Sequence, residues 1–167
     1  MTLQKLLPDD IEALAQRVVD ENKAAGRKIV VAESCTGGLV SAALTEIPGS
    51  SSIFDRGFVT YSNEAKMEAL GVPLEIIETF GAVSIACAWA MAKGALAASN
   101  ADVAVAISGV AGPGGGTALK PVGTVVFARV VRGHEGAPEG ELKKFEPTSR
   151  ADIRSEATIC ALELLLP

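Results

Sequence analysis

A short run of small polar residues and glycines, Glu33-Ser34-Cys35-Thr36-Gly37-Gly38, is the first stretch of this chain that could carry chemistry. Its glycines let the backbone approach a ligand closely, and a helix that follows such a turn directs free N–H groups at it. The Ser34 hydroxyl is therefore a candidate nucleophile beside a ready oxyanion hole. The alternative is that Ser34 or Thr36 only caps the helix, which is the commonest use of such residues.

A nucleophilic serine needs a base, and the usual histidine is poorly placed for that role. Ser34 is not in a G-x-S-x-G elbow, since Glu33 precedes it and Cys35 follows it. The only histidine, His134, falls in a hydrophilic connection. A Ser-His-Asp triad is disfavoured, whereas a lysine whose ammonium is desolvated or crowded by positive charge can accept the proton instead.

Lys66 is the candidate base, and it lies in the segment Tyr61-Ser62-Asn63-Glu64-Ala65-Lys66 beyond the second predicted strand. Tyr61 is the only tyrosine of the chain, and both side chains could reach the crevice that Ser34 faces. The alternatives are a solvated charge on a helix face for Lys66 and a half-buried strand aromatic for Tyr61.

Cys35 adjoins Ser34 and would be the intrinsically better nucleophile if its thiol faced the site. Neighbouring side chains in a turn usually point apart, so we expect at most one of the two to attack. The residues alone leave the choice open.

A second polar segment, Ser108 to Gly116, is dense in glycine and follows another predicted buried strand. It has neither the Walker A pattern nor a G-x-G-x-x-G fingerprint, so kinase, GTPase and Rossmann dinucleotide sites are disfavoured. The glycines indicate close backbone approach to a ligand, against the alternative of a flexible hairpin. Lys120 could add a cation for a phosphate or carboxylate.

The elements that must position these residues follow from hydrophobic periodicity, caps and breakers. Asn63 is the expected N-cap of the third helix. Short continuous apolar runs predict buried strands, and amphipathic or alanine-rich runs predict helices. We expect strands over residues 29–32, 57–61, 103–107, 122–131 and 141–145, and helices over 9–23, 39–47, 64–70, 73–80, 84–99 and about 153–164.

Strands interleaved with helices predict a three-layer α/β/α sandwich with a five-stranded, mostly parallel mixed sheet, whose last two strands are antiparallel. The whole chain, residues 1–167, is expected to form one domain. Ligands of such sheets bind at the carboxyl ends of strands, so the two polar clusters are predicted to face one crevice.

Composition narrows the class of function. The net charge of -5 and the scattered Lys and Arg argue against a nucleic-acid partner, although a single phosphate could still be held by backbone N–H groups. No apolar run approaches a membrane span and no leader segment is visible, so no membrane association is expected. Three cysteines without CxxC pairing fit neither a disulfide framework nor a metal site, which favours the cytoplasm.

Five ordered motifs together make the sequence resemble the C-terminal domain of CinA, a family whose stand-alone members are nicotinamide-nucleotide amidohydrolases. They are Ala32 to Gly38, Gly57 to Lys66, Gly81-Ala82-Val83-Ser84, Ile107 to Pro113 and Lys120 to Thr124. The resemblance implies hydrolysis of the carboxamide of nicotinamide mononucleotide to nicotinate mononucleotide and ammonia. No metal-ligand cluster is visible in the sequence, and no cofactor is expected. The resemblance also implies a small nucleotide substrate and a homo-oligomer.

The resemblance places the nucleophile at Ser34, with Lys66 and Tyr61 as its partners. We expect N–H groups near Thr36, Gly37 and Gly38 to stabilise the oxyanion. The substrate-binding residues that it implies are Ser108, Gly109, Gly112, Lys120 and Thr124, which would accommodate the ribose-phosphate.

Two segments depart from the family pattern. Gly114 stands where several relatives carry an acidic residue, and Pro147-Thr148-Ser149-Arg150 replaces a Gly-Asp-Arg turn, a change expected to alter only the cap of the last helix. Two other functions remain open: a non-catalytic nucleotide-binding module that regulates a partner, and an amidase or esterase for a different small substrate.

Overall fold

Five strands form one mixed sheet in the computed structural model, which describes residues 2–167. The strand order is β2-β1-β3-β4-β5; β1 pairs in parallel with β2 and β3, whereas β4 is antiparallel to both of its neighbours. The strands are β1 (Ile29–Glu33), β2 (Phe54–Val59), β3 (Val103–Gly109), β4 (Thr124–Val131) and β5 (Glu139–Lys144). The predicted mixed sheet with antiparallel last strands is confirmed.

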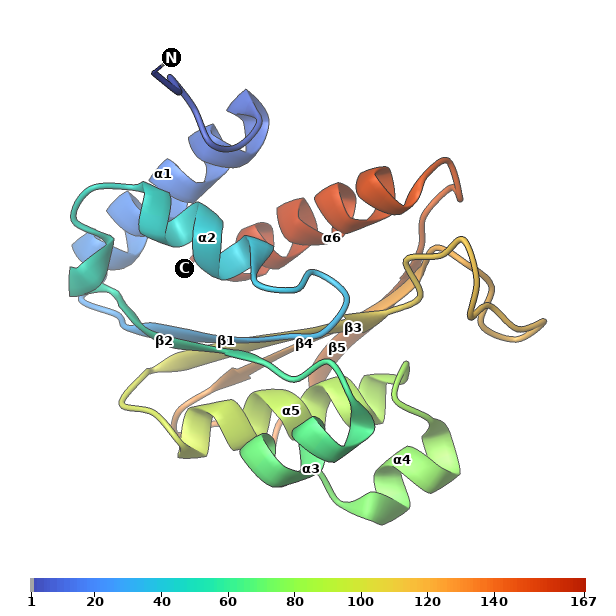
Figure 1. The fold of residues 1–167 in the computed structure, drawn as a ribbon. Helices are drawn as coiled ribbons and strands as arrows, with labels where there is room; N and C mark the ends of the chain where they lie inside the picture. The colour runs from blue at the N-terminus through green and yellow to red at the C-terminus, as the bar shows by residue number, and fades with distance from the viewer. Residues whose placement is uncertain (1) are drawn as a thin grey trace.

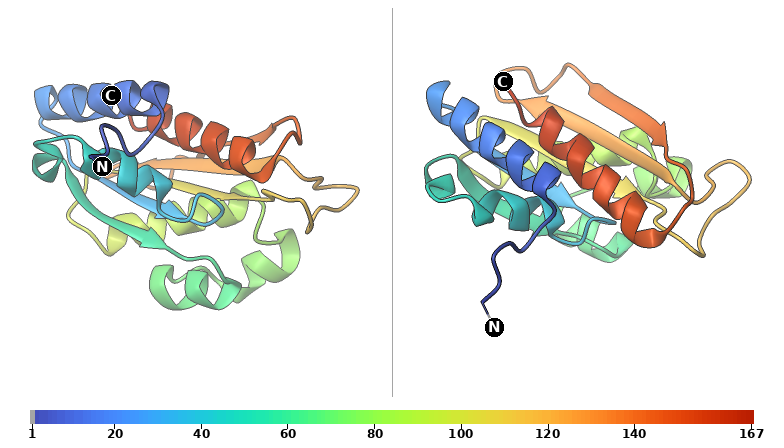
Figure 2. Two further views of the ribbon diagram at one scale, coloured as in Figure 1. Left: turned by 45° about the horizontal axis from the view of Figure 1, so that its top comes forward. Right: turned by 90° about the horizontal axis from the view of Figure 1, so that it is seen from above.

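Helices cover both faces of this sheet (Figure 1). One layer holds α1 (Asp9–Ala24), α2 (Leu39–Glu46) and α6 (Arg150–Leu164), with a short 3-10 turn η1 (Ser50–Ser52) beside α2. The other layer holds α3 (Asn63–Leu70), α4 (Leu74–Phe80) and α5 (Ile85–Ala97). Figure 2 shows α1 and α6 lying side by side over the sheet, so the predicted three-layer sandwich is confirmed.

The two faces of the central strands explain this layering, since alternate side chains point to opposite sides of a sheet. Val31 and Val105 are fully buried in the core on the α1, α2 and α6 side. Val30 and Ala104 are fully buried in the core against α5. Burial of each such valine stabilises the fold by about 1.5–3 kcal/mol, which makes β1 and β3 a firm base for the loops at their ends.

Several element boundaries differ from those that the sequence predicts, and β2 differs most. It begins at Phe54 rather than Gly57, and its register against β1 shifts between Ile29 and Val30. Asp55 and Arg56 lie in this irregular stretch. Their charges fit an edge strand, but they interrupt the apolar pattern that sequence reasoning uses, which hid the start of β2.

The N-cap of α3 is a second correction. Ser62, not Asn63, occupies that position, and its Oγ accepts a hydrogen bond from the Ala65 N–H at 3.0 Å. The helix therefore includes Asn63 as its first residue, so α3 begins within one turn of Lys66.

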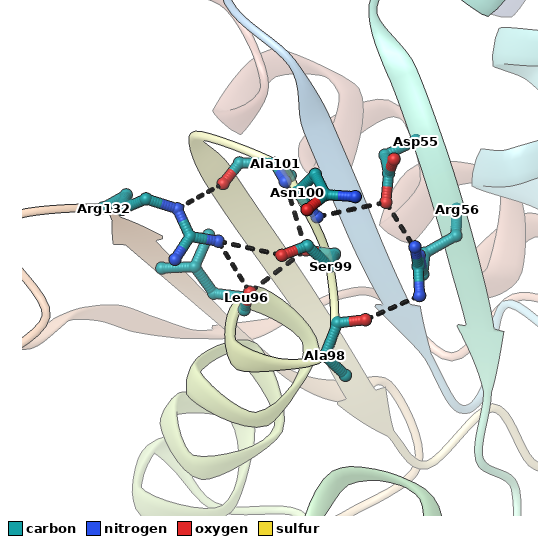
Figure 3. A network of polar contacts seen from close by, with 8 residues as sticks. All are labelled: Asp55, Arg56, Leu96, Ala98, Ser99, Asn100, Ala101 and Arg132. Atoms are coloured by element: carbon teal, nitrogen blue, oxygen red, sulfur yellow. Dashed lines mark hydrogen bonds and ion pairs between the residues drawn. The ribbon is translucent and has the colours of Figure 1, made fainter.

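Polar contacts hold together the end of the sheet where β2 and β3 begin (Figure 3). Arg132 donates to the backbone carbonyls of Leu96, Ser99 and Ala101, while Arg56 donates to the Ala98 carbonyl. These contacts fix the turn from α5 into β3. None of the helices in residues 2–167 combines the length and apolar character that a membrane crossing requires.

Candidate active site

A pocket of about 270 Å³ opens at the carboxyl ends of β1 and β3, beside the turn from β2 into α3. This is where open α/β sheets bind ligands. The lining comes from five segments of the chain and includes Ser34, Tyr61, Lys66, Ser108 and Arg150. The two polar clusters that were expected to face one crevice do line the same pocket.

Ser34 and Lys66 meet at the inner end of this pocket. Lys66 Nζ lies 3.1 Å from Ser34 Oγ, and the two side chains come from positions 32 residues apart. Ser34 follows β1 directly, and its own N–H extends the sheet by donating to the Ile107 carbonyl at 2.9 Å. The nucleophile candidate is therefore attached to the most deeply buried strand pair of the fold.

Lys66 is 1% exposed, so the alternative of a solvated charge on a helix face is wrong. Besides Ser34, its Nζ donates to the backbone carbonyls of Thr60 at 2.8 Å and Tyr61 at 3.2 Å. Within residues 2–167 it makes no ion pair. Burial lowers the pKa of the Lys66 amine below its ordinary value of 10.5, while the nearby Cys87 and Cys35 thiols act in the opposite direction.

The three oxygens around Lys66 Nζ can accept the three N–H groups of an ammonium, and the same contacts can also serve a neutral amine. A neutral amine has two N–H donors and one lone pair. The carbonyls of Thr60 and Tyr61 can take the two donors, which leaves the lone pair for the Ser34 hydroxyl. This arrangement is able to remove a proton from Ser34.

Tyr61 contributes differently from what the sequence led us to expect. Its backbone carbonyl contacts Lys66, but its side chain is 61% exposed, and its hydroxyl accepts a hydrogen bond from Arg150 at 2.9 Å. The reading of Tyr61 as a half-buried strand aromatic is wrong, since it lies beyond the end of β2. Its ring borders the mouth of the pocket.

Glu33 has a role that the sequence did not reveal. Its carboxylate is fully buried and accepts hydrogen bonds from the backbone N–H groups of Val40 at 2.9 Å and Ser41 at 3.1 Å, and from the Ser41 hydroxyl at 2.8 Å. A carboxylate at a helix N-terminus is stabilised by the helix dipole. The first N–H groups of α2, expected to face the ligand, are therefore occupied by Glu33.

Thr36, Gly37 and Gly38 lie behind the pocket rather than in its lining. Thr36 is fully buried, and the Gly37 N–H donates to the Ser34 carbonyl at 3.0 Å. Cys35 does line the pocket, and no other residue among residues 2–167 accepts a hydrogen bond from its N–H. The Cys35 N–H is thus better placed than those of the three predicted residues to stabilise an oxyanion.

The Cys35 thiol is poorly suited to attack. Burial raises its pKa to about 11, so it is almost entirely protonated at neutral pH. The thiolate, not the thiol, is the nucleophilic form. The environment favours Ser34 over Cys35 as the attacking group.

Ser108, Gly109 and Gly112, the residues expected to contact the substrate, all line the pocket. The Ser108 hydroxyl donates to the Ala82 carbonyl at 2.8 Å, which fixes the loop before α5 at the pocket edge. Gly109 is required for packing as well, because a Cβ there would lie 2.8 Å from Val125 Cγ2. Gly114 also borders the pocket, and its Cβ position is open.

Lys120 and Thr124, the remaining predicted substrate contacts, are not part of the lining. Lys120 Nζ donates to the Phe80 carbonyl at 2.5 Å and ties the glycine-rich segment to the end of α4. The buried Thr124 hydroxyl donates to the Pro121 carbonyl at 2.6 Å. Both side chains have structural contacts instead.

Arg150, which was considered only for its effect on the helix cap, lines the pocket. Its guanidinium donates to the Gly112 carbonyl at 2.6 Å and to the Tyr61 hydroxyl at 2.9 Å. Ser149 is the N-cap of α6, and its side chain accepts a hydrogen bond from the Asp152 N–H at 3.0 Å. The sequence feature that could have pointed to Arg150 is the presence of an arginine in the first turn of the last helix.

The charge of the lining favours an anionic ligand. Arg150 supplies a cationic group, and no Asp or Glu side chain is part of the lining formed by residues 2–167. In this same part of the chain, His, Cys, Asp and Glu side chains do not gather in groups of three that could hold a metal ion.

Comparison with known families and sequences gives a consistent result. Residues 11–167 match the CinA C-terminal domain. A competence-damage inducible protein from Symbiobacterium thermophilum is 56% identical over 165 residues, which cover 96% of this chain but 39% of that protein. A CinA-like protein from Akkermansia muciniphila is 50% identical over 139 residues, which cover 83% of this chain and 33% of that protein. The chain thus spans 33–39% of the length of these relatives.

Solved structures match over almost their full length. The competence/damage inducible protein CihA from Agrobacterium tumefaciens superposes with a TM-score of 0.93 at 48% identity, covering 97% of both chains. A CinA superfamily protein from Klebsiella pneumoniae superposes with a TM-score of 0.87 at 38% identity, covering 93% of this chain and 94% of that one.

Proposed function

The chain belongs to the CinA C-terminal domain family, and from this premise and the geometry of the pocket we propose that it is a nicotinamide-nucleotide amidohydrolase. It would convert nicotinamide mononucleotide and water to nicotinate mononucleotide and ammonia. The observation that carries this proposal is the contact between the buried Lys66 amine and the Ser34 hydroxyl. A base held beside an alcohol is the arrangement that acyl transfer requires.

The proposed mechanism has two steps, acylation of Ser34 and hydrolysis of the resulting ester. Lys66 Nζ takes the Ser34 proton while Ser34 Oγ attacks the carboxamide carbon, and the Cys35 N–H stabilises the resulting oxyanion. Collapse of this intermediate breaks the C–N bond, and the proton held by Lys66 leaves with the nitrogen as ammonia. Water, deprotonated by the same amine, then attacks the carbonyl carbon of the Ser34 ester. The C–Oγ bond breaks, the carboxylic acid leaves, and Lys66 returns the proton to Ser34 Oγ.

The pocket also suits the rest of this substrate. The mononucleotide carries a phosphate, and Arg150 is a cation at the pocket with a fork geometry that matches phosphate oxygens. The backbone of Gly114 and Gly115, which border the pocket without bulky side chains, permits close approach of a ribose-phosphate. Activities that belong to the remaining parts of the longer relatives are not included in this proposal.

Ammonia release from nicotinamide mononucleotide by purified protein tests the proposal. Ser34→Ala and Lys66→Ala should each abolish turnover without loss of helical signal. Ser52→Ala, at an exposed position of the η1 turn, should behave as wild type. Tight nucleotide binding by a wild-type protein that releases no ammonia would support a binding module instead. Turnover of a different small amide or ester in a substrate panel would reassign the substrate.

A further inference from the structure

Arg154 of α6 binds the backbone of the turn that follows Ser34. Its Nε donates to the Cys35 carbonyl at 3.0 Å, and its Nη2 donates to the Thr36 carbonyl at 3.3 Å. Arg154 lies outside the pocket lining. It therefore reaches the site only through the backbone of this turn.

The turn is shaped around this guanidinium. A Cβ added at Gly37, whose φ is +58°, would lie 3.2 Å from Arg154 Nη2, so the glycine leaves room for the side chain. Among residues 2–167, Arg154 supplies the one hydrogen bond that the Cys35 carbonyl accepts. Loss of the arginine would leave this carbonyl free to rotate.

Rotation of the turn would affect both groups that the reaction uses. Peptide units are planar, so the carbonyl of one residue and the N–H of the next move together. Arg154 holds the peptide units that follow Cys35 and Thr36, and the second of these contains the Gly37 N–H, which donates to the Ser34 carbonyl at 3.0 Å. The Ser34 carbonyl in turn shares its peptide unit with the Cys35 N–H. A shift of this short segment would displace the Ser34 hydroxyl from Lys66 and reorient the Cys35 N–H.

We propose that Arg154 is a positioning residue for Ser34, which keeps the hydroxyl opposite Lys66 and the Cys35 N–H open to the pocket. This inference rests on the proposed hydrolysis for its kinetic readout. A displacement of about 1 Å at a reacting group costs on the order of 10²-fold in rate, so the effect is expected in kcat.

Arg132 provides a matched control. It is also an arginine that donates to backbone carbonyls, those of Leu96, Ser99 and Ala101, but it does so at the opposite end of the sheet (Figure 3). Arg132→Met should lower the melting temperature to a similar extent as Arg154→Met. Only Arg154→Met should lower kcat, because Arg132 does not contact the Ser34 turn.

The experiment compares kcat and KM for nicotinamide mononucleotide at a temperature where all variants are folded. Arg154→Met should lower kcat by about 10- to 100-fold with KM changed by less than about threefold, and Arg154→Lys should fall between it and wild type. Methylguanidinium should restore part of the kcat of Arg154→Ala. A kcat within about twofold of wild type for Arg154→Met, or an equal loss for Arg132→Met, would overturn the inference.

Labelling of Ser34 by a fluorophosphonate probe separates this inference from the proposed substrate. Slower labelling of Arg154→Met, but not of Arg132→Met, supports the positioning role even if wild type releases no ammonia, in which case only the proposed hydrolysis fails. Equal labelling of wild type and Arg154→Met overturns the inference while leaving the hydrolysis to its own assay. A wild type that neither reacts with the probe nor releases ammonia overturns both.

Discussion

Acidification should inactivate the protein through Lys66, because the proposed reaction needs this amine without its proton. Below the pKa of the amine, the unprotonated fraction falls tenfold for each pH unit, so kcat/KM should fall with a slope of one on a logarithmic plot. Burial lowers the pKa of Lys66 from its ordinary value of 10.5. The rate should therefore rise with pH and level off below pH 10.5.

The assay is the initial rate of ammonia release at low substrate concentration in constant-ionic-strength buffers, with circular dichroism at each pH to exclude unfolding. Lys66→Arg is the control, since a guanidinium stays protonated and should give no activity at any pH. A rate that stays constant through the acid range, or that increases as the amine gains its proton, would show that Lys66 is not the base.

The same shift in pKa predicts how stability responds to pH. Between the lowered pKa of folded Lys66 and 10.5, the unfolded chain binds more protons than the folded one, so the free energy of unfolding should increase with pH in that window. Below the window both states are protonated and the cost of burying the ammonium is fully present. Urea titrations of wild type and Lys66→Met should differ in this pH dependence, and parallel curves would contradict the assignment.

Three further predictions concern other parts of the molecule. Arg150→Met removes a cation from the pocket together with its contacts to Gly112 and Tyr61, so KM for the mononucleotide should rise by about tenfold or more in steady-state kinetics. An unchanged KM would exclude phosphate binding by Arg150. Gly94→Ala should destabilise the fold by about 1–3 kcal/mol in urea titrations, because the added Cβ would collide with the Leu70 carbonyl where α5 packs on α3. A free energy of unfolding equal to that of wild type would mean that the two helices separate easily. Cys35 should react slowly with iodoacetamide at pH 8, because a pKa of about 11 leaves roughly one thiol in a thousand ionised, and rapid alkylation followed by peptide mapping would contradict this environment.

The layout of the sheet could be predicted because β1 and β3 are short, continuous apolar runs, which are typical of strands buried on both faces of a sheet. The position of Ser34 at the end of β1 follows from the same pattern. β2 was harder to place because it lies at the edge of the sheet, where Asp55 and Arg56 face polar partners instead of a core.

The environment of each site residue depends on contacts between distant parts of the chain, which a local pattern does not contain. Nothing around Lys66 in the sequence distinguishes it from a surface lysine, yet the fold buries it against Ser34. Arg150 and Arg154 reach partners 89 and 119 residues away. Glu33 could be seen beside Ser34, but its capping of α2 depends on how the turn folds back.

Trapping the covalent intermediate tests the central claim most directly. Wild-type protein mixed with nicotinamide mononucleotide, quenched in acid within one turnover and digested, should yield a peptide containing Ser34 whose mass is raised by nicotinate mononucleotide minus water, and Ser34→Ala should yield none. Ammonia release without any such adduct, or an adduct on Cys35, would contradict a mechanism in which Lys66 activates Ser34.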